Sequence, residues 1–332
     1  MIIPFTNEQA RTLINLEQQY RAWIEAERTL ASMPYDLRRK EVGGKAYLYE
    51  IHDRGGNGRS LGPWSEDHAR RLDDYRAAKE DAKARRGLAR IALEETARIC
   101  RALRVPLLAN EAGEIVREAD RRGLLGDRLL VVGTNALVAY SIEAAGVIQD
   151  APLETQDFDL AWSSQAMPSD PQVVWNLLKA VDSSYTVNME RTFQARNAKA
   201  YEVKLLVAPS RAATLAKQDK PHPIPLPEQE WLLKGRSVDH VTVCRDGTPA
   251  RIVAPDPRWF ALQKLWMARQ PKRNPLKRRK DERQGTAVLN AVAVAMPQYA
   301  FDSAFEAEIP VELAEVYADW VLQRPEPLAR RW

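Results

Sequence analysis

The sequence predicts an α+β protein, in which a mixed β-sheet with flanking helices lies between a helical N-terminal region with a small β-hairpin and a helical C-terminal region. Two observations carry this prediction. Short apolar runs of strand length alternate with helical periodicity in the middle of the chain, and long helical patterns precede and follow them. The 332 residues are 45% hydrophobic and 28% charged, which is typical of a globular protein and excludes a disordered chain.

The N-terminal region combines two helical patterns with a strand-rich insertion. Residues 7–33 carry large apolar side chains at helical spacing, which predicts an amphipathic helix. Residues 40–51 join a Gly-Gly turn to aromatic and β-branched residues, and the glycine-rich loop 54–63 follows, so we expect a small β-hairpin. Ser65 then precedes a long charged stretch, which is typical of a capped and largely solvated helix.

The middle of the chain changes period. Arg128–Gly133 is an apolar run that ends in glycine, as a buried strand does, and a helical pattern follows it. Further along, strand and helix patterns alternate again, so we expect a mixed sheet with helices packed on it. The later strand candidates are residues 158–162, 185–187 and 201–207, and the helix candidates are residues 135–145 and 173–181.

Proline positions mark the last part of the chain. Alternate prolines in residues 219–231 predict an extended loop, and residues 238–253 fit a hairpin around Asp246-Gly247. The chain reads as helical from Pro257 onward, with Asn274-Pro275 as an interruption. The expected domains are therefore residues 1–105, 106–255 and 256–332.

The charge and cysteine content limit the setting of the protein. Lys and Arg number 49 against 45 Asp and Glu, and the chain holds two cysteines, too few for a disulfide framework. The sequence has no apolar run long enough to cross a membrane and no secretory signal pattern, so we expect no membrane partner and a cytoplasmic location.

Basic residues concentrate in one segment. Residues 256–283 hold ten Lys and Arg against three acids, a net charge of +7. Within this segment Lys264 stands among apolar residues of a predicted helix, which favours a cleft over open solvent. Lys264, Arg269 and Lys280 are the candidates for contact with a triphosphate or a nucleic-acid backbone. Four of the other basic residues are expected on a solvated face: Lys272, Arg273, Arg278 and Arg279.

One pair of carboxylates carries chemistry. Asp157 and Asp159 stand two apart on a predicted strand, so their side chains point to the same face and repel each other unless a cation lies between them. Two hard oxygen ligands suit Mg²⁺ bound together with substrate phosphates. Gly133-Thr134 opens a predicted helix directly after a strand, where backbone N–H groups and a hydroxyl can bind an anion. Together they indicate phosphoryl or nucleotidyl transfer.

These residues resemble a known family. A strand, Gly-Thr and a helix followed by T-x-D-h-D, here Thr155 to Asp159, is similar to the nucleotidyltransferase fold of the DNA polymerase β superfamily, and in particular to bacterial nucleotidyltransferases related to AbiEii-type toxins. The resemblance continues through the proline-led stretch 252–265, Arg269 and Lys277 to Gln284.

The resemblance implies a division of roles. Asp157 and Asp159 would hold metal ions, Mg²⁺ or Mn²⁺, and Gly133 and Thr134 would hold the β- and γ-phosphates of a nucleoside triphosphate. The family's third carboxylate falls at Lys204, which departs from the pattern. Two alternatives follow: Glu202 on the same face supplies the missing catalytic metal ligand, or the Lys204 side chain fills the metal site as a built-in cation.

Two functions are open on the sequence. The first is a magnesium-dependent nucleotidyltransferase, a phosphorus-group transferase that moves NMP from an NTP to an acceptor hydroxyl. The resemblance implies that the acceptor is a tRNA 3′ end, and that an antitoxin partner from a toxin–antitoxin system exists; a protein or small-molecule acceptor is the other possibility. The second is a degenerate nucleotidyltransferase-fold module that binds RNA or a partner protein.

Overall fold

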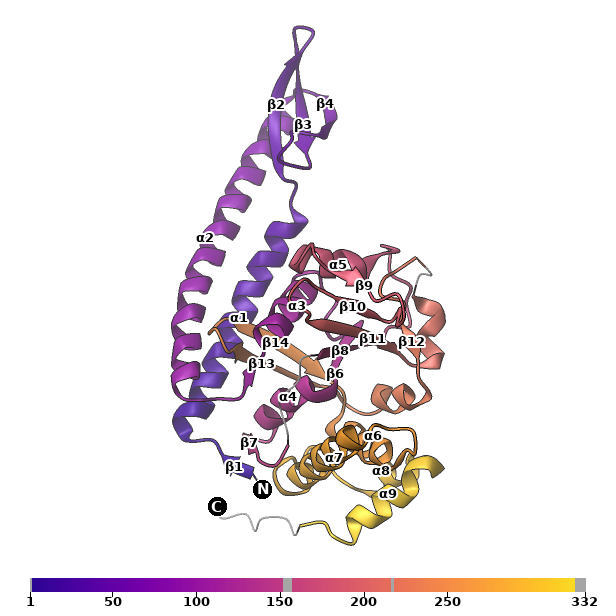
Figure 1. Cartoon of the computed structure of the whole chain (residues 1–332). Coiled ribbons are helices and arrows are strands. Elements are labelled where there is room, and N and C mark those ends of the chain that lie inside the picture. The colour runs from indigo at the N-terminus through magenta and orange to yellow at the C-terminus, as the bar shows by residue number, and fades with distance from the viewer. Residues whose placement is uncertain (1, 152–156, 216–217, 326–332) are drawn as a thin grey trace. The chain divides into compact units, whose positions relative to one another are not determined.

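The computed structural model describes residues 2–151, 157–215 and 218–325, and its contacts divide the chain into two compact units (Figure 1). One unit comprises Met1–Glu17 with Thr96–Trp332, and the other comprises Gln18–Glu95. The long helices α1 (Asn7–Ser32) and α2 (Glu66–Ala102) run through the boundaries of both units. Both helices confirm their sequence patterns. Ser65 is the cap of α2, since its side-chain oxygen accepts a hydrogen bond from the His68 N–H.

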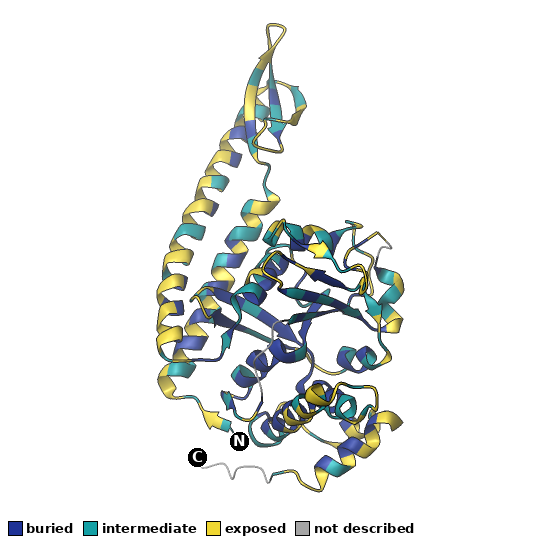
Figure 2. Cartoon of the chain, viewed as in Figure 1, coloured by how far each residue is buried: buried dark blue, intermediate teal, exposed yellow. Residues whose placement is uncertain are grey.

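The smaller unit carries a three-stranded antiparallel sheet in the order β2 (Asp36–Val42), β3 (Lys45–Ile51) and β4 (Gly58–Pro63). The sequence predicted a hairpin here and missed β2, because its run of charged residues shows no apolar alternation. Leu37 is the only buried residue of β2, and it packs with Leu48, Leu72 and Tyr75 in a small core. In Figure 2 the helical part of this unit is mostly exposed, in agreement with the charged sequence of α2.

The larger unit is built on a mixed sheet in the order β6-β8-β11-β10-β9, with β12 beside β11. Strands β8 and β11 run parallel, whereas β6 is antiparallel to β8 and β10 is antiparallel to β11. These strands confirm the expected mixed sheet and the α+β class. Their bounds are β6 (Leu129–Val132), β8 (Asp157–Trp162), β9 (Thr186–Val187), β10 (Gln194–Arg196), β11 (Glu202–Val207) and β12 (Ile224–Pro225).

Two smaller sheets complete the unit. Strands β14 (Pro249–Ala254), β13 (Val238–Cys244) and β5 (Leu107–Leu108) form one, and β1 (Ile2–Pro4) pairs with β7 (Gly146–Ile148) in the other. The predicted hairpin of β13 and β14 is confirmed. The sequence predicted an extended loop over residues 219–231, but the last part of this segment belongs to a 3-10 helix, Pro227–Leu233. This helix begins at a proline, whose fixed φ suits a first helical turn.

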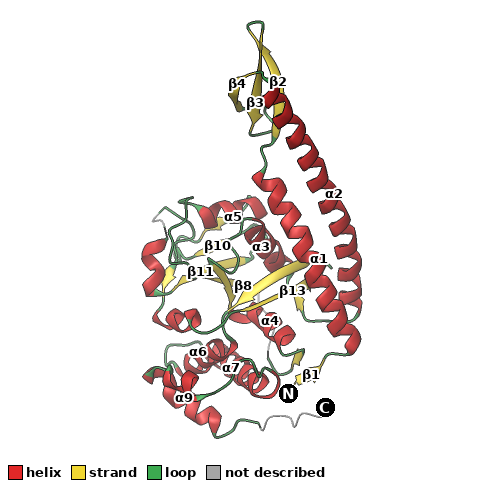
Figure 3. Ribbon diagram, turned by 180° about the vertical axis from the view of Figure 1, so that it is seen from behind, coloured by secondary structure: helices red, strands yellow, loops and turns green. Residues whose placement is uncertain are grey.

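Helices cover these sheets and carry the C-terminal region. Helix α4 packs on β13 and β14, α3 packs on β14 and α5, and α6 packs on α7 and α9, as the front and back views show (Figures 1 and 3). Helix α3 was missed by the sequence reasoning. The bounds are α3 (Asn110–Arg121), α4 (Ala136–Glu143), α5 (Val173–Val181), α6 (Pro257–Arg269), α7 (Pro275–Ala295), α8 (Ser303–Ala307) and α9 (Val311–Val321).

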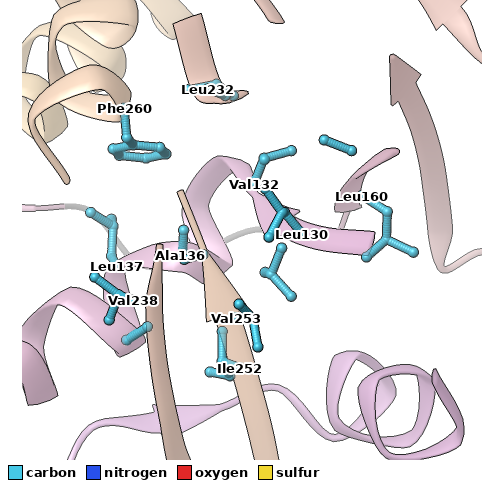
Figure 4. Close-up of a cluster of buried hydrophobic side chains, with 14 of the residues drawn as sticks. Leu130, Val132, Ala136, Leu137, Leu160, Leu232, Val238, Ile252, Val253 and Phe260 are labelled. Atoms are coloured by element: carbon cyan, nitrogen blue, oxygen red, sulfur yellow. The ribbon is translucent and has the colours of Figure 1, made fainter. Parts of the chain in front are cut away.

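A continuous hydrophobic core fixes the backbone from which the polar site projects. Figure 4 shows Val132 of β6, Leu160 of β8, Ile252 of β14 and Phe260 of α6 gathered in one buried cluster. Packing among these side chains fixes the positions of β6, β8, β14 and α6 relative to one another. Within the described ranges no helix is both long enough and apolar enough to cross a membrane.

Candidate functional site

The candidate site lies at the N-terminal end of β8. The side chains of β8 alternate, so that Phe158 and Leu160 are buried while Asp157 and Asp159 face the other way. Both aspartates line a polar cavity of about 730 Å³. Thr155 of the T-x-D-h-D motif lies outside the described residues. The expectation that the two carboxylates share one face is confirmed.

The turn after β6 packs directly against one of these carboxylates. Val132 is the register partner of Asp159, and the chain then turns through Gly133 with a φ of +67°. A Cβ atom at Gly133 would lie 2.3 Å from Asp159 Oδ2, closer than any real contact. Glycine is therefore required here twice, for its positive φ and for the space that the carboxylate occupies.

The turn continues as a short 3-10 helix into α4, as the sequence predicted for a helix start. Thr134 is buried to 7% relative exposure and lines the same cavity as the aspartates. Its hydroxyl accepts a hydrogen bond from Gln284 Nε2 of α7 at 3.3 Å, and the Asn135 side chain donates to the Asp157 carbonyl at 3.3 Å. These two bonds tie the turn to α7 and to β8.

Lys204 occupies the space between the two aspartates. In the parallel register of β8 and β11, Lys204 lies opposite Asp159 and on the same face. Its Nζ contacts Asp157 Oδ2 and lies 3.5 Å from Asp159 Oδ1. Burial by itself would lower the pKa of Lys204, but attraction to Asp159 and the bond to Asp157 outweigh it and raise the pKa, so this lysine is charged.

The pKa of Asp159 reflects the charges of both Asp157 and Lys204. Burial raises the pKa of Asp159, the neighbouring Asp157 raises it further, and Lys204 opposes both. Two carboxylates this close need a cation between them, and in this chain a lysine ammonium supplies one.

The structure does not bring Glu202 into a cluster with the aspartates. Glu202 is the register partner of Asp157 and lines the cavity. However, its Oε1 accepts hydrogen bonds from Arg196 of β10, one of them at 3.1 Å from Nε. Among the described residues no group of three or more His, Cys, Asp or Glu side chains could hold a metal ion together. Glu202 thus lies at the cavity with its carboxylate paired to an arginine of the next strand.

Basic side chains of α6, of α7 and of the loop between them line the same cavity. Lys264 Nζ lies 2.8 Å from Asp281 Oδ1, and Arg273 Nε donates to Asp281 Oδ2 at 2.8 Å. Asp281 is only 2% exposed, so it fixes both cations with little freedom. Arg273 was expected on a solvated face; it lines the cavity instead, because this buried carboxylate draws it inward.

Two more lysines of α7, Lys277 and Lys280, line the same cavity. Burial lowers the pKa of Lys280, and repulsion from Lys264 lowers it further. A cluster of cations that repel one another is a favourable environment for an anionic ligand, since the ligand removes the repulsion.

Arg269 does not line this cavity. It ends α6, where its Nη2 lies 2.6 Å from Asp319 and its Nη1 lies 3.4 Å from Glu315 of α9. It lines a separate cavity between α6, α7 and α9. Sequence reasoning in turn missed Arg196, which lies in the cavity only through the β10–β11 pairing, and the anchoring role of Asp281.

Comparison with known proteins gives one family. The nucleotidyltransferase family model matches residues 110–310, which include every cavity residue described above. Among curated proteins there is no match. One similar solved structure is an antigenic nucleotidyltransferase-like protein from Paracoccidioides brasiliensis. It is 16% identical, the alignment covers 66% of this chain and 91% of that one, and the TM-score is 0.38.

Proposed function

Because this chain belongs to the nucleotidyltransferase family, we propose that its cavity binds a nucleoside triphosphate and transfers the nucleoside monophosphate to an acceptor hydroxyl. One observation carries the proposal. The Asp159 carboxylate packs on the Gly133 turn in a cavity that basic side chains also line. Carboxylates beside an anion-binding turn suit a reaction in which phosphates are both held and attacked.

The phosphates have donors on two sides. The backbone N–H groups at the start of α4 and the Thr134 hydroxyl would donate to the terminal phosphates. Lys264, Lys277 and Lys280 would face them from α6 and α7, as point charges that neutralise the triphosphate and then the departing pyrophosphate. Asp281 would act as a positioning residue: its carboxylate holds the Lys264 ammonium in place and is not itself a ligand of the phosphates.

A divalent ion has a place in this site together with phosphates. Asp157 and Asp159 are hard oxygen donors that face the cavity, and the glycine at position 133 lets the Asp159 carboxylate lie against the turn. They fit one Mg²⁺ or Mn²⁺ that completes its shell with phosphate oxygens. When bound, the ion would neutralise charge on the phosphates and align them.

The reaction itself is an in-line displacement. The acceptor hydroxyl gives up its proton to water, its oxygen forms a bond to the α-phosphorus, and the bond from that phosphorus to the pyrophosphate breaks. The contribution of this chain is position and charge. The turn and the lysines hold the triphosphate still, and the basic side chains stabilise the negative charge that gathers on the leaving group.

Labelling with nucleoside triphosphates tests the proposal. The full chain is incubated with each of the four α-³²P-labelled triphosphates, with Mg²⁺ or Mn²⁺, and with total RNA or a protein extract as acceptor. We expect label on one acceptor class, and a loss of roughly 100-fold or more in Asp159→Asn because a metal and phosphate contact is removed. Asp319→Asn is the matched control, since Asp319 pairs with Arg269 outside the cavity. Equal labelling by both variants contradicts the assignment.

The proposed acceptor and protein partner rest only on the resemblance to AbiEii-type toxins. A tRNA 3′ end is the first acceptor to test, followed by other RNA and by protein hydroxyls. A toxin role would require that expression stops growth and that a cognate antitoxin relieves it. Asp159→Asn should abolish the growth arrest if transfer causes it.

A further inference from the structure

The ammonium group of Lys204 lies where the two aspartates would together hold a cation. Lys204 Nζ contacts Asp157 and lies 3.5 Å from Asp159, and its side chain is only 15% exposed. Its place is set by the sheet, since β11 pairs with β8 over six residues and Lys204 falls opposite Asp159. A one-residue shift of β11 would turn the lysine to the core, so this register holds the ammonium at the carboxylates.

Lys204 does not belong to the hydrophobic core of the described residues. Its neighbours Val203 and Leu205 are buried on the opposite face of β11, so the lysine adds nothing to the core. A buried ammonium is costly to desolvate, and both aspartates compensate for it. The side chain is therefore kept at this position by the carboxylates and balances their charge.

We propose that Lys204 is a built-in cation that takes the place of one divalent ion, so that this site binds a single divalent ion per chain, and does so together with a triphosphate. The second half of this statement rests on the proposed function. Two-metal sites clamp phosphate chemistry with two ions on shared carboxylates. Here the shared carboxylates already hold one positive charge in the protein.

The charges of the cavity support one ion and oppose two. Asp157, Asp159 and Lys204 sum to −1, and the pair of Arg196 with Glu202 is neutral. The remaining charged lining residues sum to +3: Lys264, Arg273, Lys277, Lys280 and Asp281. The net charge of the cavity is therefore +2. A triphosphate adds roughly four negative charges and one divalent ion adds two positive charges, so the total is about zero. A second divalent ion would leave an excess of two positive charges in a half-buried site, which is unfavourable.

Equilibrium dialysis with Mn²⁺ tests the proposal without turnover. Mn²⁺ bound per chain is counted with Mn²⁺ alone and with Mn²⁺ plus inorganic tripolyphosphate, a probe that needs no knowledge of the base. The variants are Lys204→Met, Lys204→Asp and the conservative Lys204→Arg. Lys199→Met is the matched control, because Lys199 is exposed and does not line the cavity. Circular dichroism and thermal unfolding verify that each variant folds.

With Mn²⁺ alone, we expect weak binding by the wild type, Lys204→Arg and Lys199→Met. Lys204→Met should bind at least tenfold more tightly, because the carboxylates lose their internal cation. With tripolyphosphate, the wild type should hold one Mn²⁺ and Lys204→Asp two. Binding by Lys204→Met that matches the wild type, or two Mn²⁺ in the wild type, overturns the proposal.

The two proposals fail in different ways. If the wild type binds no tripolyphosphate, the proposed nucleotide function and the triphosphate-dependent half of this inference fall together. The experiment with Mn²⁺ alone still decides whether Lys204 acts as the internal cation, because it involves no phosphate.

Discussion

Alanine at Gly133 should damage the site through a single methyl group. At a φ of +67° any L side chain costs about 1–2 kcal/mol of unfolding free energy. The new Cβ would in addition stand 2.3 Å from Asp159 Oδ2 and 3.2 Å from Asp159 Cγ. Forcing the carboxylate aside adds about 1–3 kcal/mol, the usual cost of overpacking. We therefore expect Gly133→Ala to lose about 2–5 kcal/mol in total.

Gly123→Ala separates the two costs. Gly123 has the same φ of +67°, and a Cβ there meets nothing within 4 Å. This control should lose only the backbone cost of about 1–2 kcal/mol, which corresponds to a fall in Tm of roughly 2–8 °C.

Urea unfolding measures the stability of the two variants, and equilibrium dialysis measures their Mn²⁺ binding. Gly133→Ala should unfold at lower urea than Gly123→Ala and should also lose Mn²⁺ binding with tripolyphosphate, because Asp159 is displaced from the cavity. Gly123→Ala should keep that binding. Equal unfolding midpoints and unchanged binding in both variants would refute the argument that the turn and the carboxylate share this space.

Three further predictions concern ion pairing, packing and pH. Asp281→Asn should lose about 3–5 kcal/mol in urea unfolding and weaken tripolyphosphate binding, because a buried lysine and a partly buried arginine lose their counter-ion. Arg269→Ala removes an exposed pair and should lose less than about 1 kcal/mol. Gly285→Ala places a Cβ 2.8 Å from a backbone oxygen of α6 and should lose about 1–3 kcal/mol, whereas Gly87→Ala has open space on α2 and should gain about 0.5–1 kcal/mol; a gain in both would contradict the packing argument. The hydrogen bond from His240 lowers the pKa of Glu143 from its ordinary 4.5, so its stabilisation is full above pH 4.5 and is lost as pH falls through the folded pKa. The stability difference between the wild type and Glu143→Gln should therefore shrink as pH falls below 4.5, and a constant difference would contradict this sign.

Local periodicity was sufficient for much of the architecture. The alternation in Asp157–Trp162 places two aspartates on one face whatever the neighbours are, because side chains in a strand alternate with a period of two. The helix start after Gly133 and the cap at Ser65 likewise depend on a few adjacent residues. The sequence reasoning missed β2, whose charged residues show no apolar alternation. It also missed α3, although Ala112, Ile115, Val116 and Ala119 stand at helical spacing.

Pairing between distant residues could only be decided by the tertiary structure. The sequence left open whether Glu202 or Lys204 belongs with the aspartates, because both share a face of β11. In the folded chain β10 brings Arg196 to Glu202, while the Lys204 ammonium lies at both aspartates of β8. These contacts join residues far apart in the chain, so no local pattern encodes them.

The same distinction separates the basic residues. By sequence Lys264 and Arg269 are two cations five residues apart on one helix, and both were candidates for phosphate. In the folded chain Asp281 of α7 fixes Lys264 in the cavity, while Asp319 of α9 holds Arg269 outside it. The sequence by itself therefore determined which residue types form the site, and the packing of helices and strands decided which of them meet, because electrostatic partners are chosen by distance in space.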